Sequence, residues 1–321
     1  MRHLKHLILA LTLVSTSANA QQMVRDDFAL DGDVTVDVKT DGSNPFNVTY
    51  DGPAPAAPVT IGNGQWNPAW AKFRVAEYAT TGVLAAASIT ASFVVPAPSS
   101  ANWKGGILVD EPVRNLLRLK TQSARDAANT ASNYVLYALI AAPFALDGIE
   151  YLAHKESGEA AFQVLMIDAE SMAILGSTLL LTKDLVARER PYGRNCGTSE
   201  ADPGCNSGDR NVSFFSGHTA MATNAAAMIC TAHENLHPLG GVGDDIACIT
   251  AAVAATATGA LRIMADKHYF SDVMTGAAMG IFSGYVLPKL LHYTKTKNIP
   301  AVAPWVDPTN GGGGLSVSGV W

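Results

Sequence analysis

The chain has 321 residues, of which 48% are hydrophobic and 16% charged, and its formal net charge is −6. This acidic balance, with no basic patch, argues against nucleic acid as a partner. None of the four cysteines stands at a metal-binding spacing. The alanine-rich composition is typical of a helical protein, and the features of the first 20 residues favour an exported bacterial one.

Residues 1–20 read as a secretory signal peptide. Arg2 and Lys5 give a basic start, residues 7–14 form an apolar run, and residues 18–20 (Ala-Asn-Ala) form a small-residue cleavage site. An uncleaved anchor is the alternative, although the apolar run is short for a membrane span. We therefore expect an exported chain that is periplasmic or membrane-associated.

The rest of the chain divides into an irregular N-terminal arm (residues 21–67), a helical domain (68–298) and a Pro/Gly-rich tail (299–321). The glycine run of the tail predicts a flexible linker. The domain is expected to hold helices over residues 68–95, 111–152, 160–190, 218–237, 246–267 and 272–295.

Three arginines fall along the second expected helix. Arg114, Arg118 and Arg125 predict a solvated or ion-paired face. One of them could also line the entrance to a site.

Lys183 and Arg190 are seven residues apart, and Pro191 follows directly. On a helix that ends at the proline, side chains at this spacing lie on one face, two turns apart, and can bind one anion. Arginine binds two phosphate oxygens with its planar fork, whereas lysine supplies a compact charge. Taken alone, such a pair is usually a solvated helix face.

Two further clusters contain histidines. Residues 216–218 (Ser-Gly-His) precede a helical run, so their backbone N–H groups would meet an anion at the positive end of a helix. Arg262, His268 and Asp272 form the third cluster, in which the carboxylate stands four residues after the histidine and can fix its tautomer. Three cations, two histidines and a carboxylate form a complete set of groups for phosphoryl transfer.

Taken in this order, the patterns Lys-x6-Arg-Pro, Ser-Gly-His and Arg-x5-His-x3-Asp resemble the signature of the type 2 phosphatidic acid phosphatase (PAP2) superfamily. That superfamily also includes bacterial class A acid phosphatases and vanadium haloperoxidases. The resemblance covers residues 183–272. It implies an all-α fold, a compact bundle of about six main helices.

The resemblance also implies roles for the site residues. His268 would attack phosphorus and form a phosphohistidine, Asp272 would orient it, and His218 would protonate the leaving oxygen. No metal or other cofactor is implied, because fixed cations take the place of magnesium. The phosphate would be bound by side chains and backbone donors of Lys183, Arg190, Ser216, Gly217 and Arg262.

Two positions depart from the family pattern. Phe215 stands where proline is usual, and Leu261 stands where serine is usual. The lost serine hydroxyl removes one possible phosphate contact, which puts efficiency and substrate range in doubt more than the reaction class.

The even number of cysteines suggests disulfides in an oxidising compartment. Cys196 with Cys205 would close the loop after Arg190, and Cys230 with Cys248 would join two consecutive helices. Other pairings remain possible, and the second pair could also be buried free thiols.

Several expected helices are nearly long enough to cross a membrane. Asp168 and Glu170 interrupt one of them, and the alanine content makes each only moderately hydrophobic. Three spans before Lys183 would also place the Cys196–Cys205 loop in the cytoplasm, where a disulfide is not expected. The sequence therefore favours a soluble or peripherally attached periplasmic bundle, with an integral membrane protein as the alternative.

The expected function is a metal-independent phosphatase acting on a lipid phosphate or diphosphate, or on small soluble esters. One alternative is a haloperoxidase in which His268 binds vanadate, and another is a catalytically silent helical scaffold. The sequence does not determine the substrate or the oligomeric state.

Overall fold

The computed structural model describes the side chains of residues 64–146, 158–199 and 201–294. For residues 147–153 and for four strands it describes the backbone alone. The expected signal peptide lies outside the described residues.

The chain divides into two units, Met1–Thr60 and Ile61–Trp321. In the first unit, β1 (Val34–Val38) pairs antiparallel with β2 (Phe46–Tyr50). The arm expected over residues 21–67 therefore contains a short hairpin.

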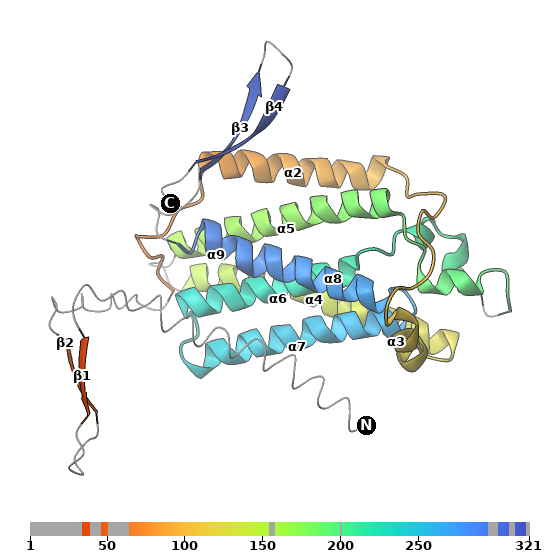
Figure 1. Ribbon diagram of the computed structural model, residues 1–321, viewed down its shortest axis with the longest axis horizontal. Helices are drawn as coiled ribbons and strands as arrows, with labels where there is room; N and C mark the ends of the chain where they lie inside the picture. The colour runs from red at the N-terminus through yellow and green to blue at the C-terminus, as the bar shows by residue number, and fades with distance from the viewer. Residues whose placement is uncertain are drawn as a thin grey trace. The chain divides into compact units, whose positions relative to one another are not determined.

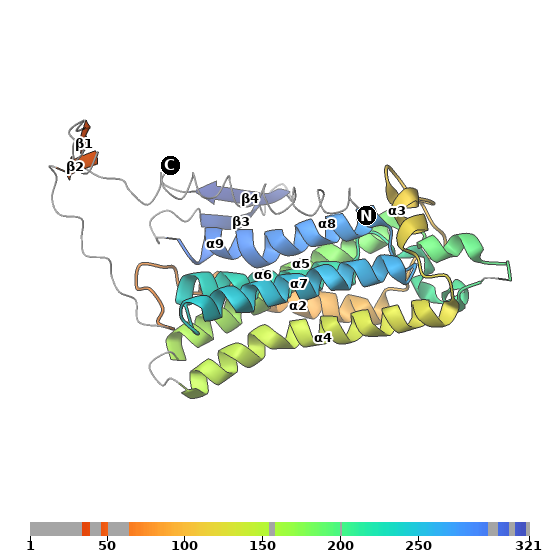
Figure 2. The same cartoon turned by 90° about the horizontal axis from the view of Figure 1, so that it is seen from below.

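The second unit is a helical bundle, so the all-α expectation is confirmed (Figure 1, Figure 2). Its α-helices are α2 (Val75–Val94), α3 (Asp110–Leu117), α4 (Gln122–Ala153), α5 (Gly158–Val186), α6 (Gly217–Leu236), α7 (Val242–Met264), α8 (Phe270–Ile281) and α9 (Leu287–Leu291). The turns η2 (Pro191–Asn195), η3 (Pro203–Asn206) and η4 (Gly208–Asn211) follow α5, and the π-helical segment η5 (Phe282–Val286) joins α8 to α9.

α6 lies at the centre of the bundle, where it contacts α4, α5, α7 and α8. Its buried face consists largely of alanines, including Ala220, Ala222 and Ala225, each 0% exposed. Such small side chains allow neighbouring helices to approach closely. Larger side chains of α4, among them Leu136 and Leu139, fill the remaining space in this core.

Three glycines let α8 and η5 pack directly on the backbone of α6. A Cβ atom added at Gly276 would lie 2.7 Å from the carbonyl oxygen of Ser216, and one added at Gly280 would lie 2.5 Å from that of Ala220. Gly284 makes the same close approach to Asn224. This packing fixes the start of α8 against the start of α6, which are the two places where the predicted histidine clusters lie.

Replacing Gly280 by alanine should destabilise the fold. The added Cβ meets rigid backbone, so we expect a loss of about 1–3 kcal/mol in the free energy of unfolding. Gly176→Ala is the matched control, because no atom lies within 4 Å of a Cβ added there and alanine is favoured over glycine inside a helix by about 0.5–1 kcal/mol. Equal stability of the two variants in thermal unfolding would contradict this packing.

The helix predicted over residues 111–152 is interrupted. α3 ends at Leu117 and α4 begins at Gln122. Arg125 donates to the backbone carbonyls of Leu119 and Lys120 and so satisfies the connecting turn.

Arg114 and Arg118 form ion pairs, which is one of the two alternatives expected for the arginines of this region. Both donate to the carboxylate of Asp266, which is 0% exposed and follows α7. Their charges therefore connect α3 to the turn that precedes His268.

Apolar side chains are exposed along two helices. On α7, Val242, Ile246, Ile249 and Val253 follow one another at helical spacing and are 59–71% exposed. Helix α2 exposes residues of the same kind, including Phe93 at 85%. By length and composition, α5 and α7 could cross a membrane. In the apolar stretch of each helix, only 39% of the residues of α5 and 33% of those of α7 are buried.

The C-terminal tail contains a second hairpin. β3 (Ala301–Asp307) pairs antiparallel with β4 (Gly312–Ser318), and Asp307 stands opposite Gly312. The prediction of a flexible linker at the glycine run is wrong for Gly312 to Gly314, because backbone pairing incorporates them into a strand.

Candidate active site

The first cluster lies at and beyond the end of α5, not on one continuous helix. Lys183 is in the last turn, whereas Arg190 has extended backbone angles and precedes η2. The helix ends at Val186 because Ala187 adopts a left-handed conformation with φ 44° and the chain then pairs with Trp103. The prediction that Lys183 and Arg190 share one helix face is therefore wrong.

Lys183 nevertheless lies beside the second cluster. A Cβ atom added at Gly217 would lie 3.5 Å from its Nζ. Burial, and then the positive charge of Arg190, lower the pKa of Lys183 to about 8. Among the side chains described around it, no carboxylate forms an ion pair with this ammonium group. A bound anion would supply the missing negative charge.

His268 is buried, and its two ring nitrogens have different partners. Nδ1 donates to the backbone carbonyl of Ser213 at 2.8 Å, so Nε2 carries the lone pair of the ring and accepts a hydrogen bond from Arg190. Nη1 of Arg190 lies 3.1 Å from Nε2. Burial, followed by the charges of Arg190, Arg262 and Lys183, holds the pKa of His268 well below its usual value. The neutral ring with Nε2 unprotonated is the form that a nucleophilic histidine requires.

Arg190 is held in place by backbone carbonyls. Nε donates to Asp209 at 2.7 Å, and Nη1 donates to Lys267 at 3.0 Å. Backbone carbonyls carry no net charge, so these hydrogen bonds orient the guanidinium group without neutralising it. Its positive charge therefore remains available to a phosphate.

The second cluster forms the start of α6. Ser216 caps the helix, its hydroxyl accepts from the N–H of Thr219, and its own N–H donates to the carbonyl of Asp272 at 3.0 Å. The N–H groups of Gly217 and His218 come next and have no acceptor among the described residues. The expected backbone donors are therefore those of residues 217 and 218, not that of Ser216.

Asp272 does not contact His268 by a direct hydrogen bond. Its Oδ2 lies 3.7 Å from Nδ1 and instead accepts from the hydroxyl of Ser213 at 2.6 Å and the N–H of Tyr269 at 2.9 Å. The carboxylate thus positions His268 through Ser213, whose carbonyl binds the imidazole.

Arg188 is a site residue that the sequence analysis missed. It is 0% exposed, it pairs with Asp272 through Nη1 and it pairs with Asp110 through Nη2 at 2.8 Å. The guanidinium also lies between the rings of Trp103 and Tyr269, with Cζ 3.8 and 4.1 Å from their centroids. It joins the loop before α3 to the start of α8.

Helix α4 contributes three further residues that sequence spacing did not indicate. Asn129 and Ser132 accept hydrogen bonds from Nη1 of Arg262 at 2.6 and 3.1 Å. Asn133 contacts Nε2 of His218 through Oδ1 at 2.7 Å. Arg262 and His218, the two side chains that these residues contact, both belong to the predicted site.

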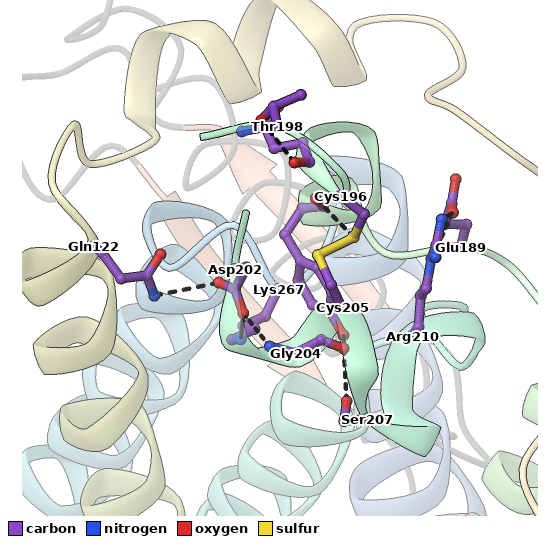
Figure 3. The surroundings of a disulfide bond; sticks show 12 residues. Gln122, Glu189, Cys196, Thr198, Asp202, Gly204, Cys205, Ser207, Arg210 and Lys267 are labelled. Atoms are coloured by element: carbon purple, nitrogen blue, oxygen red, sulfur yellow. Dashed lines mark hydrogen bonds and ion pairs between the residues drawn. A yellow bond between two sulfur atoms is a disulfide. The ribbon is translucent and has the colours of Figure 1, made fainter. Parts of the chain in front are cut away.

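The two disulfides expected from the sequence both form. Cys230–Cys248 joins α6 to α7, and Cys196–Cys205 closes the loop after η2. Figure 3 shows Asp202 of that loop beside Lys267, with Nζ 3.1 Å from Oδ1. The loop is therefore connected to the residue that precedes His268.

One group of metal-ligand type lies elsewhere in the described part of the bundle. Atoms of Glu77, Glu170 and His292 lie within 4.8 Å of one another, and all three residues are buried. Glu77 accepts hydrogen bonds from Arg74, and Glu170 accepts from His292 at 2.8 Å. These pairings account for the group without an ion.

One family model matches the region of the chain that contains the site. Residues 165–296 match the family model of the PAP2 superfamily. The match covers the part of the chain that contains the site. It includes all eight predicted catalytic and phosphate-binding residues, from Lys183 to Asp272.

A solved structure resembles the chain more distantly. The PAP2-type transmembrane phosphatidylglycerolphosphate phosphatase of Bacillus subtilis is 16% identical, with a TM-score of 0.40. The similarity covers 66% of this chain and 92% of that one. No curated protein matches the sequence.

The surroundings of His218, a half-buried histidine, predict that the fold is sensitive to acid. Burial, followed by the charges of Arg262, Arg190 and Lys183, lowers the pKa of His218 to about 3. Below the ordinary histidine pKa of about 6.5 the unfolded chain takes up a proton that the folded chain does not. Stability contributed by this group is therefore lost as the pH falls from 6.5 toward 3.

His218→Gln should reduce the pH dependence of the free energy of unfolding. We expect the slope between pH 6 and pH 4 to fall by up to about 1.4 kcal/mol per pH unit. His237→Gln, at a histidine whose side chain is 61% exposed, serves as the control. Unchanged slopes in both variants would show that His218 takes up its proton equally in the two states.

Proposed function

We propose that this protein is a phosphatase that hydrolyses phosphomonoesters through a phosphohistidine intermediate on His268. The observation that carries the proposal is the unprotonated Nε2 of a buried histidine, 3.1 Å from Arg190. The proposed reaction needs no metal ion, because fixed cations perform the charge neutralisation.

The substrate phosphate would bind between the start of α6 and the three cations. Lys183, Arg190 and Arg262 would neutralise the phosphate oxygens, and the N–H groups of Gly217 and His218 would donate to them. Such fixed donors stabilise the charge that spreads over the oxygens in the transition state.

The first chemical step is attack by Nε2 of His268 on phosphorus. A P–N bond forms as the bond from phosphorus to the ester oxygen breaks, and its electron pair leaves with that oxygen. His218 gives a proton to the departing oxygen, which becomes an alcohol. Nδ1 of His268 keeps its proton and its hydrogen bond to the carbonyl of Ser213. The positive charge that develops on the His268 ring is therefore stabilised by that carbonyl and by Asp272.

The second step is hydrolysis of the phosphohistidine. A water molecule attacks phosphorus, His218 accepts its proton, and the P–N bond breaks with its electron pair returning to Nε2. Free phosphate leaves and both histidines regain their starting state.

The exposed apolar residues support a lipid phosphate as substrate. The stripe on α7 and the apolar side chains of α2 suit contact with lipid, and a membrane-associated enzyme meets lipid phosphates at that surface. This observation favours membrane association, whether peripheral or integral, over the soluble form that the sequence also allowed. The Cys196–Cys205 bond beside the site supports placement on the periplasmic side, because disulfides persist in oxidising compartments.

Activity of His268→Ala tests the proposal. Phosphate release is measured in EDTA from an aryl phosphate and from a detergent-dispersed lipid phosphate. We expect the wild type to hydrolyse both, with the lipid preferred, and the variant to lose at least about 10³-fold in kcat. Preference for the aryl ester would favour a broad-specificity phosphatase.

His237→Ala is the matched control. It also removes a histidine, but an exposed one that directly follows α6 at the end away from His218, so its activity should equal that of the wild type. Retention of activity in His268→Ala, or loss of wild-type activity in EDTA, would contradict the mechanism.

A further inference from the structure

Helix α4 presents three polar side chains to the proposed site from one face. Asn129, Ser132 and Asn133 stand at positions i, i+3 and i+4, so they point in similar directions. The first two hold Arg262, whereas Asn133 contacts His218. One face of α4 therefore contacts two site residues, Arg262 and His218. Among its three polar side chains, Asn133 is the one that contacts His218.

The contact of Asn133 decides which nitrogen of His218 meets the substrate. An amide oxygen can only accept a hydrogen bond, so Nε2 of His218, 2.7 Å from Oδ1, carries a proton. Nδ1 forms no hydrogen bond with any residue in the described ranges. It is the ring nitrogen that remains for the leaving oxygen.

The charges that face His218 make this contact important. Lys183 approaches from α5, Arg190 from the segment before η2, and Arg262 from α7, and all three disfavour protonation of the ring. No carboxylate among the described residues opposes them at His218. The oxygen of Asn133 is therefore the group that stabilises the imidazolium, together with the negative charge that a bound phosphate brings.

We propose that Asn133 is the positioning residue of the general acid, holding His218 with Nδ1 toward the leaving oxygen and stabilising its protonated form. This inference rests on the proposed phosphatase function. When the bond from phosphorus to the ester oxygen breaks, Nδ1 gives its proton to that oxygen, and Nε2 keeps its proton and its bond to Asn133. In the hydrolysis step Nδ1 accepts the proton of the attacking water.

A neutral amide suits both steps better than a carboxylate would. An aspartate at this position would keep the ring charged even without substrate, as a paired carboxylate favours the charged form. With asparagine, the ring is neutral in the empty site and gains stability as a cation when the phosphate dianion binds. The negative charge of the substrate therefore favours protonation of His218, which makes it a general acid.

The dependence of kcat/KM on the leaving group tests this role. The 4-nitrophenolate ion leaves without protonation, whereas an alkoxide requires a proton. For Asn133→Ala we expect kcat/KM to fall by about 10- to 100-fold with hexyl phosphate, and by less than about threefold with 4-nitrophenyl phosphate. Thr130→Ala, at an exposed residue of the same helix, should match the wild type with both esters.

Two further variants separate positioning from loss of structure. Asn133→Asp keeps the acceptor, so it should restore most of the hexyl phosphate activity and move the alkaline limb of its pH profile to higher pH. Asn129→Ala releases Arg262 instead and should lower kcat/KM for both esters alike.

Equal losses with both esters in Asn133→Ala, from a wild type that hydrolyses both, would overturn this inference and leave the phosphatase proposal standing. Failure of Asn133→Asp to restore activity, with its thermal unfolding unchanged, would also overturn it. A wild type that hydrolyses neither ester would overturn both proposals.

Discussion

The buried guanidinium of Arg188 is the interaction on which the arrangement of the site depends. It pairs with Asp110 on one side and Asp272 on the other, and aromatic rings cover both of its faces. Removing one partner of such a buried group costs about 3–5 kcal/mol, because the remaining charge loses its compensation. Through Asp272 and Ser213, the same guanidinium determines the orientation of His268.

The site combines this compensated charge with charge that is left uncompensated. Arg188 is paired on both sides, whereas Lys183 and Arg190 form no ion pair with any carboxylate in the part of the chain that the structure describes. Like charges held together disfavour the empty site, and a phosphate dianion relieves their repulsion. The close packing of Gly276 and Gly280 on α6 holds the start of α8, and with it His268, against these charges, because rigid backbone contacts fix the two helices. The fold thus supplies the stability that the site itself lacks.

The chemistry of the site could be predicted from sequence because the three clusters have fixed spacings and unusual residue types. His218 stands on α6 and His268 in the turn between α7 and α8, yet each belongs to a recognisable pattern, and the structure brings both to the same cations. The position of Arg190 was predicted less well. The end of α5 depends on the left-handed conformation of Ala187, and alanine gives no sequence signal for that conformation.

The supporting residues could not be predicted for a different physical reason. Asp110 and Asn133 lie far from the clusters along the chain, and their ion pair and hydrogen bond with site residues form only in the folded protein. An aspartate at a helix start and an asparagine among alanines have ordinary local explanations, so neither stands out. Arg188 lies within the first cluster, but its role became visible only when the chain after α5 proved to be extended. The exposed faces of α2 and α7 likewise required the structure, since their hydrophobicity alone fits a buried core helix as well.

Direct detection of the covalent intermediate tests the central claim most sharply. The wild-type enzyme is mixed with excess 4-nitrophenyl phosphate, quenched in alkali, which preserves phosphohistidine, and digested for peptide mass spectrometry. The account predicts one phosphoryl group on His268, present in Asn133→Ala and absent in His268→Gln. Phosphate on another residue, or turnover by the wild type with no phosphorylated peptide, would contradict it.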